Sequence, residues 1–368
     1  MNPTVSFVVP CYNLGHLLKE CVDSILSQTY RNFEVLIMDD CSPDQTPEVA
    51  RSLDDPRVRH IRNEPNLGHL SNYNKGIRMT RGKYVWLISA DDRLLRPDVL
   101  QKYVSVAENN PSVGYVCSSA VEIRRGEYTP VAAYSAHHGG DTIYEGHIFL
   151  QKLLYSNSVV AASAMVRKSC YDNLGAFPLD MPFAGDWYLW CLFALYYDVA
   201  YISEPAVAYR IHEGSMTEAL VERNAHVCVQ DDLAVLWRIK ERAKNAGLPD
   251  TVDKARKAIA FEYARQVIGK RYRGVICRMS IADCEQSIKR FSAALEEAAD
   301  LAFRVRVSIG DLETQHGNTT AALEWYRRAI QMRPRALALW IKVALLKTGS
   351  LGAHIRRSTL LLRSRASN

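Results

Sequence analysis

The sequence predicts an α/β N-terminal domain, built on a doubly wound and mostly parallel sheet, followed by an all-α C-terminal region. Three observations support this class. Short β-rich runs alternate with amphipathic helical patterns up to about residue 217. Beyond that point, long segments rich in Ala, Leu, Arg, Glu and Lys replace the alternation. The 368 residues and 48% hydrophobic content are ordinary for a globular chain of about two or three domains.

The elements of the N-terminal domain follow one another in a βαβαβ rhythm. Strands are expected at 5–9, 33–38, 58–61 and 84–88, and helices at 17–28, from 46 onward, and from 69 to about 79. The run 84–88 is almost wholly apolar, which predicts a central strand. Two of these strands lead into paired acids, Asp39-Asp40 and Asp91-Asp92. Ligands bind beyond the carboxyl ends of the strands in such sheets, so both pairs are expected at a ligand site.

The C-terminal region is predicted to be helical at 219–245, 250–270, 281–303 and 319–332. We expect three segments along the chain: a catalytic-type domain at 1–217, a helical extension at 218–302, and a third segment at 303–368. In the third segment, Ala322, Tyr326, Ala329 and Pro334 have the spacing of the second half of a tetratricopeptide repeat. Gly310 and Trp340 occupy further positions of that pattern, whereas Glu313 replaces an expected aromatic residue. The segment resembles one such repeat; an ordinary helical hairpin is the alternative interpretation.

Charge is distributed unevenly between the two regions. Residues 1–217 carry a formal net charge of −5 and residues 218–368 one of +11. The last residues, from Arg335 to Asn368, hold seven basic side chains and no acidic one. In the tail, arginines alternate with Leu351, Ile355 and a Leu360–Leu362 run, which predicts an amphipathic helix on an anionic membrane surface. A solvated helical face is the alternative, and nucleic acid is not expected because no basic aromatic groove or zinc-finger spacing accompanies the charge.

Composition also indicates a compartment. The longest apolar run, 190–202, is too short to span a membrane and contains Asp198. No signal peptide is apparent, and the nine cysteines form no Cys-x-x-Cys pair, which favours a reducing environment. We therefore expect a cytoplasmic protein, with a peripheral position at the inner face of the cell membrane.

The Asp91-Asp92 pair is the first candidate site. Two adjacent carboxylates held at the end of a buried strand repel each other, and a hard divalent cation relieves this repulsion. Mg²⁺ or Mn²⁺ held by one or two carboxylates and by substrate phosphates is the usual arrangement. A surface turn before a helix is the alternative, so the pair needs support from other motifs.

Several short motifs occur together with this pair. They are Val8-Val-Pro-Cys-Tyr-Asn13, Ser24-Ile-Leu-Ser-Gln-Thr29, Met38-Asp-Asp-Cys-Ser-Pro-Asp44, Ala90-Asp-Asp92 and Gly185-Asp-Trp187. In combination, over residues 4–217, they strongly resemble the family 2 glycosyltransferases of the GT-A fold. The resemblance implies a GT-A nucleotide-diphospho-sugar transferase fold, a nucleotide-sugar donor, and a divalent metal, Mn²⁺ or Mg²⁺.

The resemblance also implies roles for individual residues. The nucleotide-binding residues are Pro10, Tyr12, Asn13, Asp40 and Asp91. Tyr12 lies against the base and Asp40 accepts a hydrogen bond from it. Asp92 is the main metal ligand, with His212 as a second candidate, and Arg210 either contacts the diphosphate or pairs internally. Asp186 matches the catalytic base, although it could also cap the helix that follows it.

These roles define a mechanism and its alternatives. One base and one metal, without a second nucleophile, predict single displacement with inversion onto a hydroxyl of a growing, lipid-linked surface polysaccharide. The sequence departs from the family pattern at three positions where the family commonly has a charged residue. This chain has Ser89, Tyr73 and Gly185 there. They motivate a second hypothesis, a catalytically vestigial nucleotide-binding scaffold that recruits protein partners, or self-associates, through its helical region. A nucleotidyltransferase ranks last, because Pro10-Cys-Tyr-Asn13 replaces the glycine-rich phosphate loop that it would need.

Overall fold

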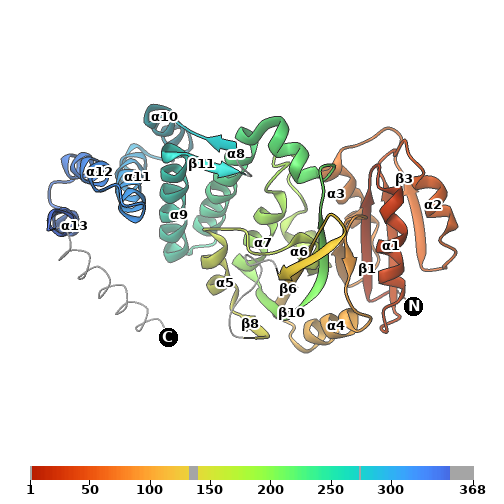
Figure 1. The fold of residues 1–368 in the computed structure, drawn as a ribbon. Helices are drawn as coiled ribbons and strands as arrows, with labels where there is room; N and C mark the ends of the chain where they lie inside the picture. Colours follow the sequence, from red (N-terminus) through yellow and green to blue (C-terminus); the bar gives the residue numbers. More distant parts are fainter. Residues whose placement is uncertain (1, 132–139, 273–274, 349–368) are drawn as a thin grey trace. The chain divides into compact units, whose positions relative to one another are not determined.

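The computed structural model describes residues 2–131, 140–272 and 275–348 (Figure 1). The chain forms two compact units, Met1–Val252 and Asp253–Asn368. The first unit extends past the boundary expected near Thr217, because helix α8 (Met216–Asn245) packs against α7 (Gly185–Tyr196). The predicted basic tail, 351–368, lies outside the described residues.

The N-terminal unit is organised around one mixed sheet with the strand order β3-β2-β1-β4-β9-β6-β10-β5, to which β7 and β8 add at β6 and β10. The strands are β1 (Val5–Cys11), β2 (Phe33–Asp39), β3 (Val58–Arg62), β4 (Tyr84–Leu87), β5 (Arg93–Leu94), β6 (Val113–Arg124), β7 (Glu127–Val131), β8 (Thr142–Tyr144), β9 (Met165–Arg167) and β10 (Asp198–Ile211). Neighbours β1 to β4 pair in parallel, as do β6 and β10, while β9 runs antiparallel to both β4 and β6. The prediction of a mostly parallel sheet is confirmed, and the six long parallel strands end at one edge.

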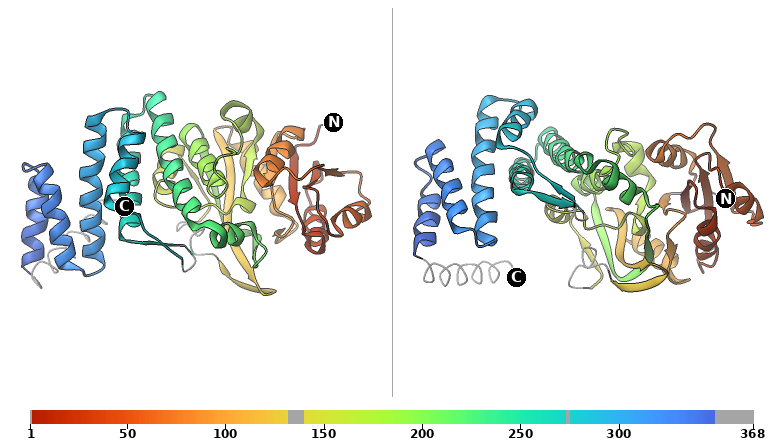
Figure 2. Two further views of the ribbon diagram at one scale, coloured as in Figure 1. Left: turned by 90° about the horizontal axis from the view of Figure 1, so that it is seen from above. Right: turned by 45° about the horizontal axis from the view of Figure 1, so that its top comes forward.

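Helices cover both faces of this sheet (Figures 1 and 2). They are α1 (Gly15–Leu26), α2 (Thr46–Ser52), α3 (His69–Met79), α4 (Val99–Asn109), α5 (Gly146–Leu153), α6 (Lys168–Leu174), α7 and α8, with a short 3₁₀ turn η2 (Ala161–Ser163). On one face, α1 and α4 pack over Phe7 and Trp86, whose rings stack with centroids 5.5 Å apart. On the other face, α3 approaches so closely that a Cβ at Gly76 would lie 2.5 Å from Cγ1 of Val8.

The C-terminal unit is helical, with one addition that the sequence analysis missed. Its elements are α9 (Pro249–Ile268), α10 (Ile281–Phe291), α11 (Leu295–Gln315), α12 (Thr319–Met332) and α13 (Leu337–Lys347), with a hairpin of β11 (Lys270–Tyr272) and β12 (Val275–Cys277). The hairpin contradicts the expectation that strands stop at 218; its three-residue strands are too short to show a period. The single helix expected at 281–303 is two helices, because the chain becomes extended at Ser292 and Ala294.

Within this unit, α11 and α12 pack through a small-to-large contact. Gly310 lies under the ring of Tyr326, where a Cβ would be 2.5 Å from Cε1 of the tyrosine. The Tyr326 hydroxyl donates to Oδ1 of Asp311 at 2.6 Å. The glycine is therefore required by close packing, which is the role that the repeat-like spacing gives to a small residue.

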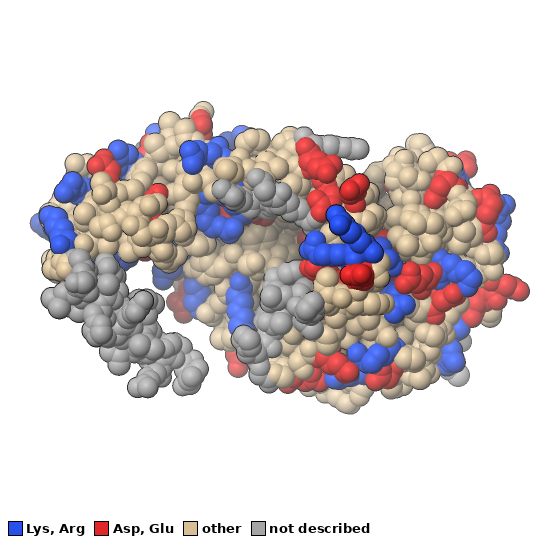
Figure 3. Space-filling view, in the orientation of Figure 1, with Lys and Arg blue, Asp and Glu red and all other residues tan. Residues whose placement is uncertain are grey.

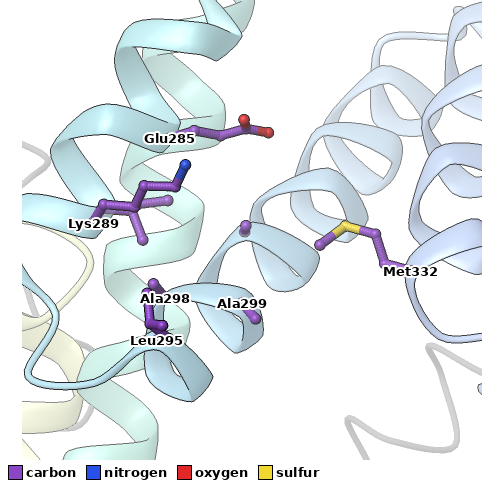
Figure 4. Close-up of a pocket in the computed structure, with 8 residues that line it drawn as sticks. Glu285, Lys289, Leu295, Ala298, Ala299 and Met332 are labelled. Atoms are coloured by element: carbon purple, nitrogen blue, oxygen red, sulfur yellow. The ribbon is translucent and has the colours of Figure 1, made fainter.

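A pocket of about 230 Å³ opens between α10, α11 and α12 (Figure 4). Its lining is mainly apolar, from Ile288, Leu295, Ala298, Ala299, Ala302 and Met332, with Glu285 and Lys289 at its rim. None of the residues implicated by the sequence motifs lies there, so this pocket is separate from the predicted chemistry.

The surface carries both signs of charge. On the face shown in Figure 3, basic and acidic side chains alternate over the N-terminal unit rather than forming one continuous basic field. Among the described residues, no helix combines the length and apolar character needed to cross a bilayer.

Candidate active site

The carboxyl ends of the parallel strands bring the motif residues together. The chain beyond β4 runs along β1, where the amide of Ala90 donates to the carbonyl of Pro10 at 3.1 Å. The chain beyond β2 does the same on the other side, where the amide of Asp40 donates to the carbonyl of Cys11 at 2.9 Å. The segments that follow β1, β2 and β4 therefore form one continuous edge, as the parallel topology requires.

The end of β1 carries an exposed aromatic ring. Pro10 is buried, whereas the Tyr12 side chain is 53% exposed. Asn13 adopts a left-handed backbone with φ of 59°, which Asn tolerates better than most residues, and its amide donates to Oγ of Ser42 at 3.1 Å. The loop after β1 is thus tied to the loop after β2, and the Tyr12 ring remains accessible for stacking.

Asp40 is held rigidly at the end of β2. It is 3% exposed, and its Oδ1 accepts from Nδ2 of Asn63 and from the amide of Leu67, both at 2.8 Å. Asn63 is fixed in turn by Nζ of Lys75, which donates to its Oδ1 at 2.6 Å. Within the described chain, Oδ2 of Asp40 has no hydrogen-bond partner, so one oxygen of this fixed carboxylate is left to accept from a ligand.

Asp39 shapes the turn beside it. Its Oδ1 accepts from the amide of Ser42 at 2.8 Å, and its Oδ2 from Nη1 of Arg62 at 2.7 Å. Burial alone would raise the pKa of this carboxyl, but the hydrogen bonds from Ser42, Arg62 and His60 outweigh it and lower the pKa. Asp39 is therefore an ionised structural group, a role that the sequence analysis did not assign to it.

Asp91 and Asp92 follow β4 and face the end of β10. Asp92 is 4% exposed, and its Oδ1 accepts from the amide of Arg210 at 2.9 Å. Burial, and then the negative charge of Asp91, raise the pKa of Asp92 well above its usual range. In Asp91, Oδ2 lies 3.1 Å from Nε2 of His212, while Oδ1 is buried without a hydrogen-bond partner.

These residues fit a divalent cation. Two adjacent carboxylates, one carrying an orphaned buried oxygen, form a donor set that a hard cation would satisfy. Among the residues that the structure describes, no three His, Cys, Asp or Glu side chains come together as a metal-ligand group. Mg²⁺-type ions are commonly held by one or two carboxylates, with substrate phosphates and waters as the other ligands.

Arg210 is committed to internal contacts. Its Nε donates to the carbonyl of Asp91 and its Nη2 to Oε2 of Glu20, both at 2.9 Å. Of the two alternatives from the sequence, the structure shows the internal pairing. The guanidinium braces the turn that holds Asp91 and Asp92, and the Glu20 contact, 190 residues away in sequence, follows from no local pattern.

Asp186 is the second residue of α7 rather than its cap, because Ala184 occupies the N-cap position. Its Oδ1 accepts from the amide of Trp187 at 2.6 Å, and its Oδ2 from Nδ2 of Asn157 at 3.2 Å. Burial raises the pKa of this carboxyl to about 6, although both hydrogen bonds act in the opposite direction. A carboxylate with this proton affinity is suited to accept a proton near neutral pH.

The start of α7 is anchored by a residue from α8. The buried carboxylate of Asp231 accepts from the amides of Phe183 and Ala184, at 2.7 and 3.2 Å. On the other side, His69 of α3 contacts the carbonyl of Pro182 at 3.0 Å. Sequence reasoning missed Asp231 and Asn157, because each reaches Asp186 or its loop from a segment that has no recognisable motif.

The three departures from the family pattern lie in different surroundings. Tyr73 of α3 is within electrostatic reach of Asp91, Asp186 and Asp92; burial first, and then these charges, raise the pKa of its phenol above the usual range. A Cβ at Gly185 would make only ordinary contacts, the nearest 3.5 Å from Phe177. The carbonyl of Ser89 accepts from the amide of Asp92 at 3.0 Å. Only Tyr73 puts a new side chain among the acids.

Comparison with known proteins agrees with this arrangement. Residues 6–171 match the family model described as glycosyl transferase family 2. This stretch of the chain is therefore similar to the family 2 glycosyltransferases. The match covers β1 to β9 and therefore includes Asp40, Asp91 and Asp92, while Asp186 and His212 lie beyond it.

Relatives and solved structures extend this result. The chain is similar to the glycosyltransferase GlyG of Streptococcus pneumoniae, with 36% identity over 115 residues, 31% of this chain and 38% of GlyG. It is also similar to an uncharacterised glycosyltransferase of Haemophilus influenzae, with 28% identity over 225 residues, 59% of this chain and 68% of the relative. The chain thus spans well under half of GlyG. The crystal structure of S. aureus TarS 1-349 shares the fold, with a TM-score of 0.60 and 18% identity over 90% of this chain and 88% of that one.

Proposed function

We propose that this protein transfers a sugar from a nucleotide-diphosphate donor to a hydroxyl group, with inversion at the anomeric carbon. The observation that carries the proposal is that Tyr73 lies within electrostatic reach of both the Asp91-Asp92 pair and Asp186, a separate carboxylate whose pKa is raised to about 6. The match to the family 2 model supports a nucleotide sugar as the donor.

Asp186 acts as the general base. Its ionised carboxylate accepts the proton of the acceptor hydroxyl as the oxygen attacks the anomeric carbon and the bond to the nucleoside diphosphate breaks. Proton transfer to a single carboxylate, with direct attack of the hydroxyl on the anomeric carbon, corresponds to a single displacement. Asp92 and Asp91, with His212 behind Asp91, would hold a divalent Mg²⁺ or Mn²⁺ ion, which would neutralise charge on the departing diphosphate.

The remaining residues bind the donor. The exposed Tyr12 ring stacks on the nucleobase, Pro10 and Asn13 shape the loop beneath it, and Oδ2 of Asp40 accepts a hydrogen bond from the base edge. A UDP sugar is the first donor to test, since TarS has been crystallised with UDP and with UDP-GlcNAc.

The acceptor is a growing surface glycan, lipid-linked at the cytoplasmic face of the membrane, to which the basic tail attaches the enzyme. The helical region binds a protein partner or a second copy of the chain.

Nucleotide binding tests the donor and cation assignments. Thermal unfolding is measured with UDP, GDP, dTDP and CDP, each with and without Mn²⁺, on the wild type, Asp92→Ala and Asp172→Ala. Asp172 is a matched control, because it is an exposed carboxylate whose ion pair is with Lys168. Ligand at a hundred times its Kd stabilises the fold by about 2.7 kcal/mol. One nucleotide should stabilise the wild type and the control in a Mn²⁺-dependent way but not Asp92→Ala. No stabilisation by any nucleotide would contradict the proposal and favour a scaffold that recruits proteins.

A further inference from the structure

The loop between α5 and η2 lies beside the start of α7, at the carboxylate proposed to be the base. One hydrogen bond joins α7 to the last residue of α5, and a second joins it to the loop. Nε1 of Trp187 donates to the carbonyl of Leu153 at 2.8 Å, and Nδ2 of Asn157 donates to Oδ2 of Asp186 at 3.2 Å. The two elements are 29 residues apart in sequence, so these contacts depend on the folded unit.

The amide of Asn157 has a defined orientation. Its Oδ1 accepts from the amide of Val159 at 3.2 Å, within its own loop. Rotating the side-chain amide by half a turn would place its oxygen against the carboxylate of Asp186 and its NH₂ against the Val159 amide. Both hydrogen bonds would then be lost, so the local network allows one orientation.

Asp186 is held by two neutral donors rather than by a cation. The amide of Trp187 fixes Oδ1 and Asn157 fixes Oδ2, so the plane of the carboxylate is determined. This differs from Asp39, whose contact with Arg62 lowers its pKa and suits a structural anion. Neutral donors orient the oxygens and leave Asp186 the proton affinity that burial provides.

The titratable groups around Asp186 do not replace this contact. Tyr73 faces it from α3 and Cys191 from its own helix, and both are neutral because burial raises their pKa values. From α8, Asp231 binds the amides that precede the helix. Asn157 is the group that reaches Asp186 from the α5–η2 loop. The Tyr73 hydroxyl donates instead to Sδ of Met216, at 3.9 Å.

We propose that Asn157 is a positioning residue for the transfer reaction: it orients Oδ2 of Asp186 toward the acceptor and stabilises the ionised carboxylate. This inference rests on the proposed role of Asp186 as base. Removing the side-chain amide of Asn157 should raise the pKa of Asp186. The midpoint of the acidic side of the pH–rate profile should then move to higher pH.

The test uses the full-length chain and the variants Asn157→Ala and Asn157→Asp, with Asn109→Ala as control. Asn109 is exposed on α4, and its Nδ2 contacts only Oγ of Ser105, at 3.4 Å. Carbon-13 NMR of the Asp186 carboxyl carbon reports its titration without any substrate. We expect the pKa to rise by about one pH unit in Asn157→Ala, since a hydrogen bond to a charged group is lost. It should rise further in N157D, where two carboxylates share a site, and stay unchanged in the control.

Activity is measured on the same proteins as a pH–rate profile. The midpoint of the acidic side of the profile should rise in the order wild type, Asn157→Ala, N157D, while KM for the donor stays unchanged. A merely structural role of Asn157 would instead lower the rate equally at every pH. An Asp186 pKa that does not move in Asn157→Ala overturns the inference, whether or not a donor is turned over. If the pKa moves as expected but the wild type transfers no sugar from any nucleotide donor, the proposed function is overturned instead.

Discussion

The anchor that α8 provides for the base helix leads to a quantitative prediction. Asp231 is 5% exposed, and its Oδ2 accepts from the amides of Phe183 and Ala184. Asp231→Ala would leave both amides without an acceptor in a largely buried setting, at a cost of about 1–3 kcal/mol each. Removing the carboxylate also removes the cost of burying its charge, which is what raises its pKa. We therefore expect the free energy of unfolding to fall by about 2–4 kcal/mol in Asp231→Ala.

Asp231→Asn separates the hydrogen bonds from the charge. Its amide oxygen can still accept from both amides, so we expect a loss below about 1 kcal/mol at pH 7. Because burial raises the folded-state pKa of Asp231, the stability linked to its protonation is present below about pH 4 and is lost as the pH rises through the folded-state pKa. The difference in free energy of unfolding between the wild type and Asp231→Asn should therefore become smaller as the pH rises above about 4.

Urea unfolding followed by tryptophan fluorescence, at pH 4 and pH 7, measures these differences. Asp172→Ala, which removes an exposed carboxylate from α6, is the control and should stay within about 0.5 kcal/mol of the wild type. If Asp231→Ala were as stable as this control, the two hydrogen bonds would not hold the start of α7, and the reasoning would be wrong.

Three further predictions concern other parts of the chain. Because the pKa of Asp186 is raised to about 6, kcat/KM should fall about tenfold per pH unit below that value, and a profile that stays flat to about pH 4 would exclude Asp186 as the base. Tyr73→Phe removes a hydroxyl within electrostatic reach of Asp91, Asp92 and Asp186, so turnover should drop about tenfold with an unchanged unfolding midpoint; equal turnover would show that the phenol takes no part. Gly310→Ala should destabilise the C-terminal unit by about 1–3 kcal/mol, because its Cβ would lie 2.5 Å from the Tyr326 ring; an unchanged urea midpoint would contradict this packing.

Much of the fold was predictable because its strands carry simple patterns. The expected strand at 33–38 is found at Phe33–Asp39, and the one at 58–61 at Val58–Arg62. Parallel strands end at one edge, so the Asp-Asp pairs that follow β2 and β4 could be assigned to the same edge without coordinates. His212 was matched from a late motif, 209–216, that begins within β10, and the structure brings it to 3.1 Å from Asp91.

The contacts that tune the site were not predictable. Asn157 and Asp231 lie in a loop and on a long helix, and nothing in their local sequence distinguishes them from other polar residues. Their partners depend on how α5, α7 and α8 pack, which no periodicity encodes. The hairpin β11–β12 was missed for a related reason: strands of three residues are shorter than the patterns that identify a strand.

The most direct test of the account is transfer by wild type and Asp186→Asn. Release of nucleoside diphosphate from a panel of nucleotide sugars is followed with Mn²⁺ and a mixture of glycan acceptors, and nucleotide binding is measured on the same samples. We predict that Asp186→Asn binds the nucleotide as the wild type does but that its turnover is at least about a hundredfold slower. Equal turnover by the two proteins would contradict it.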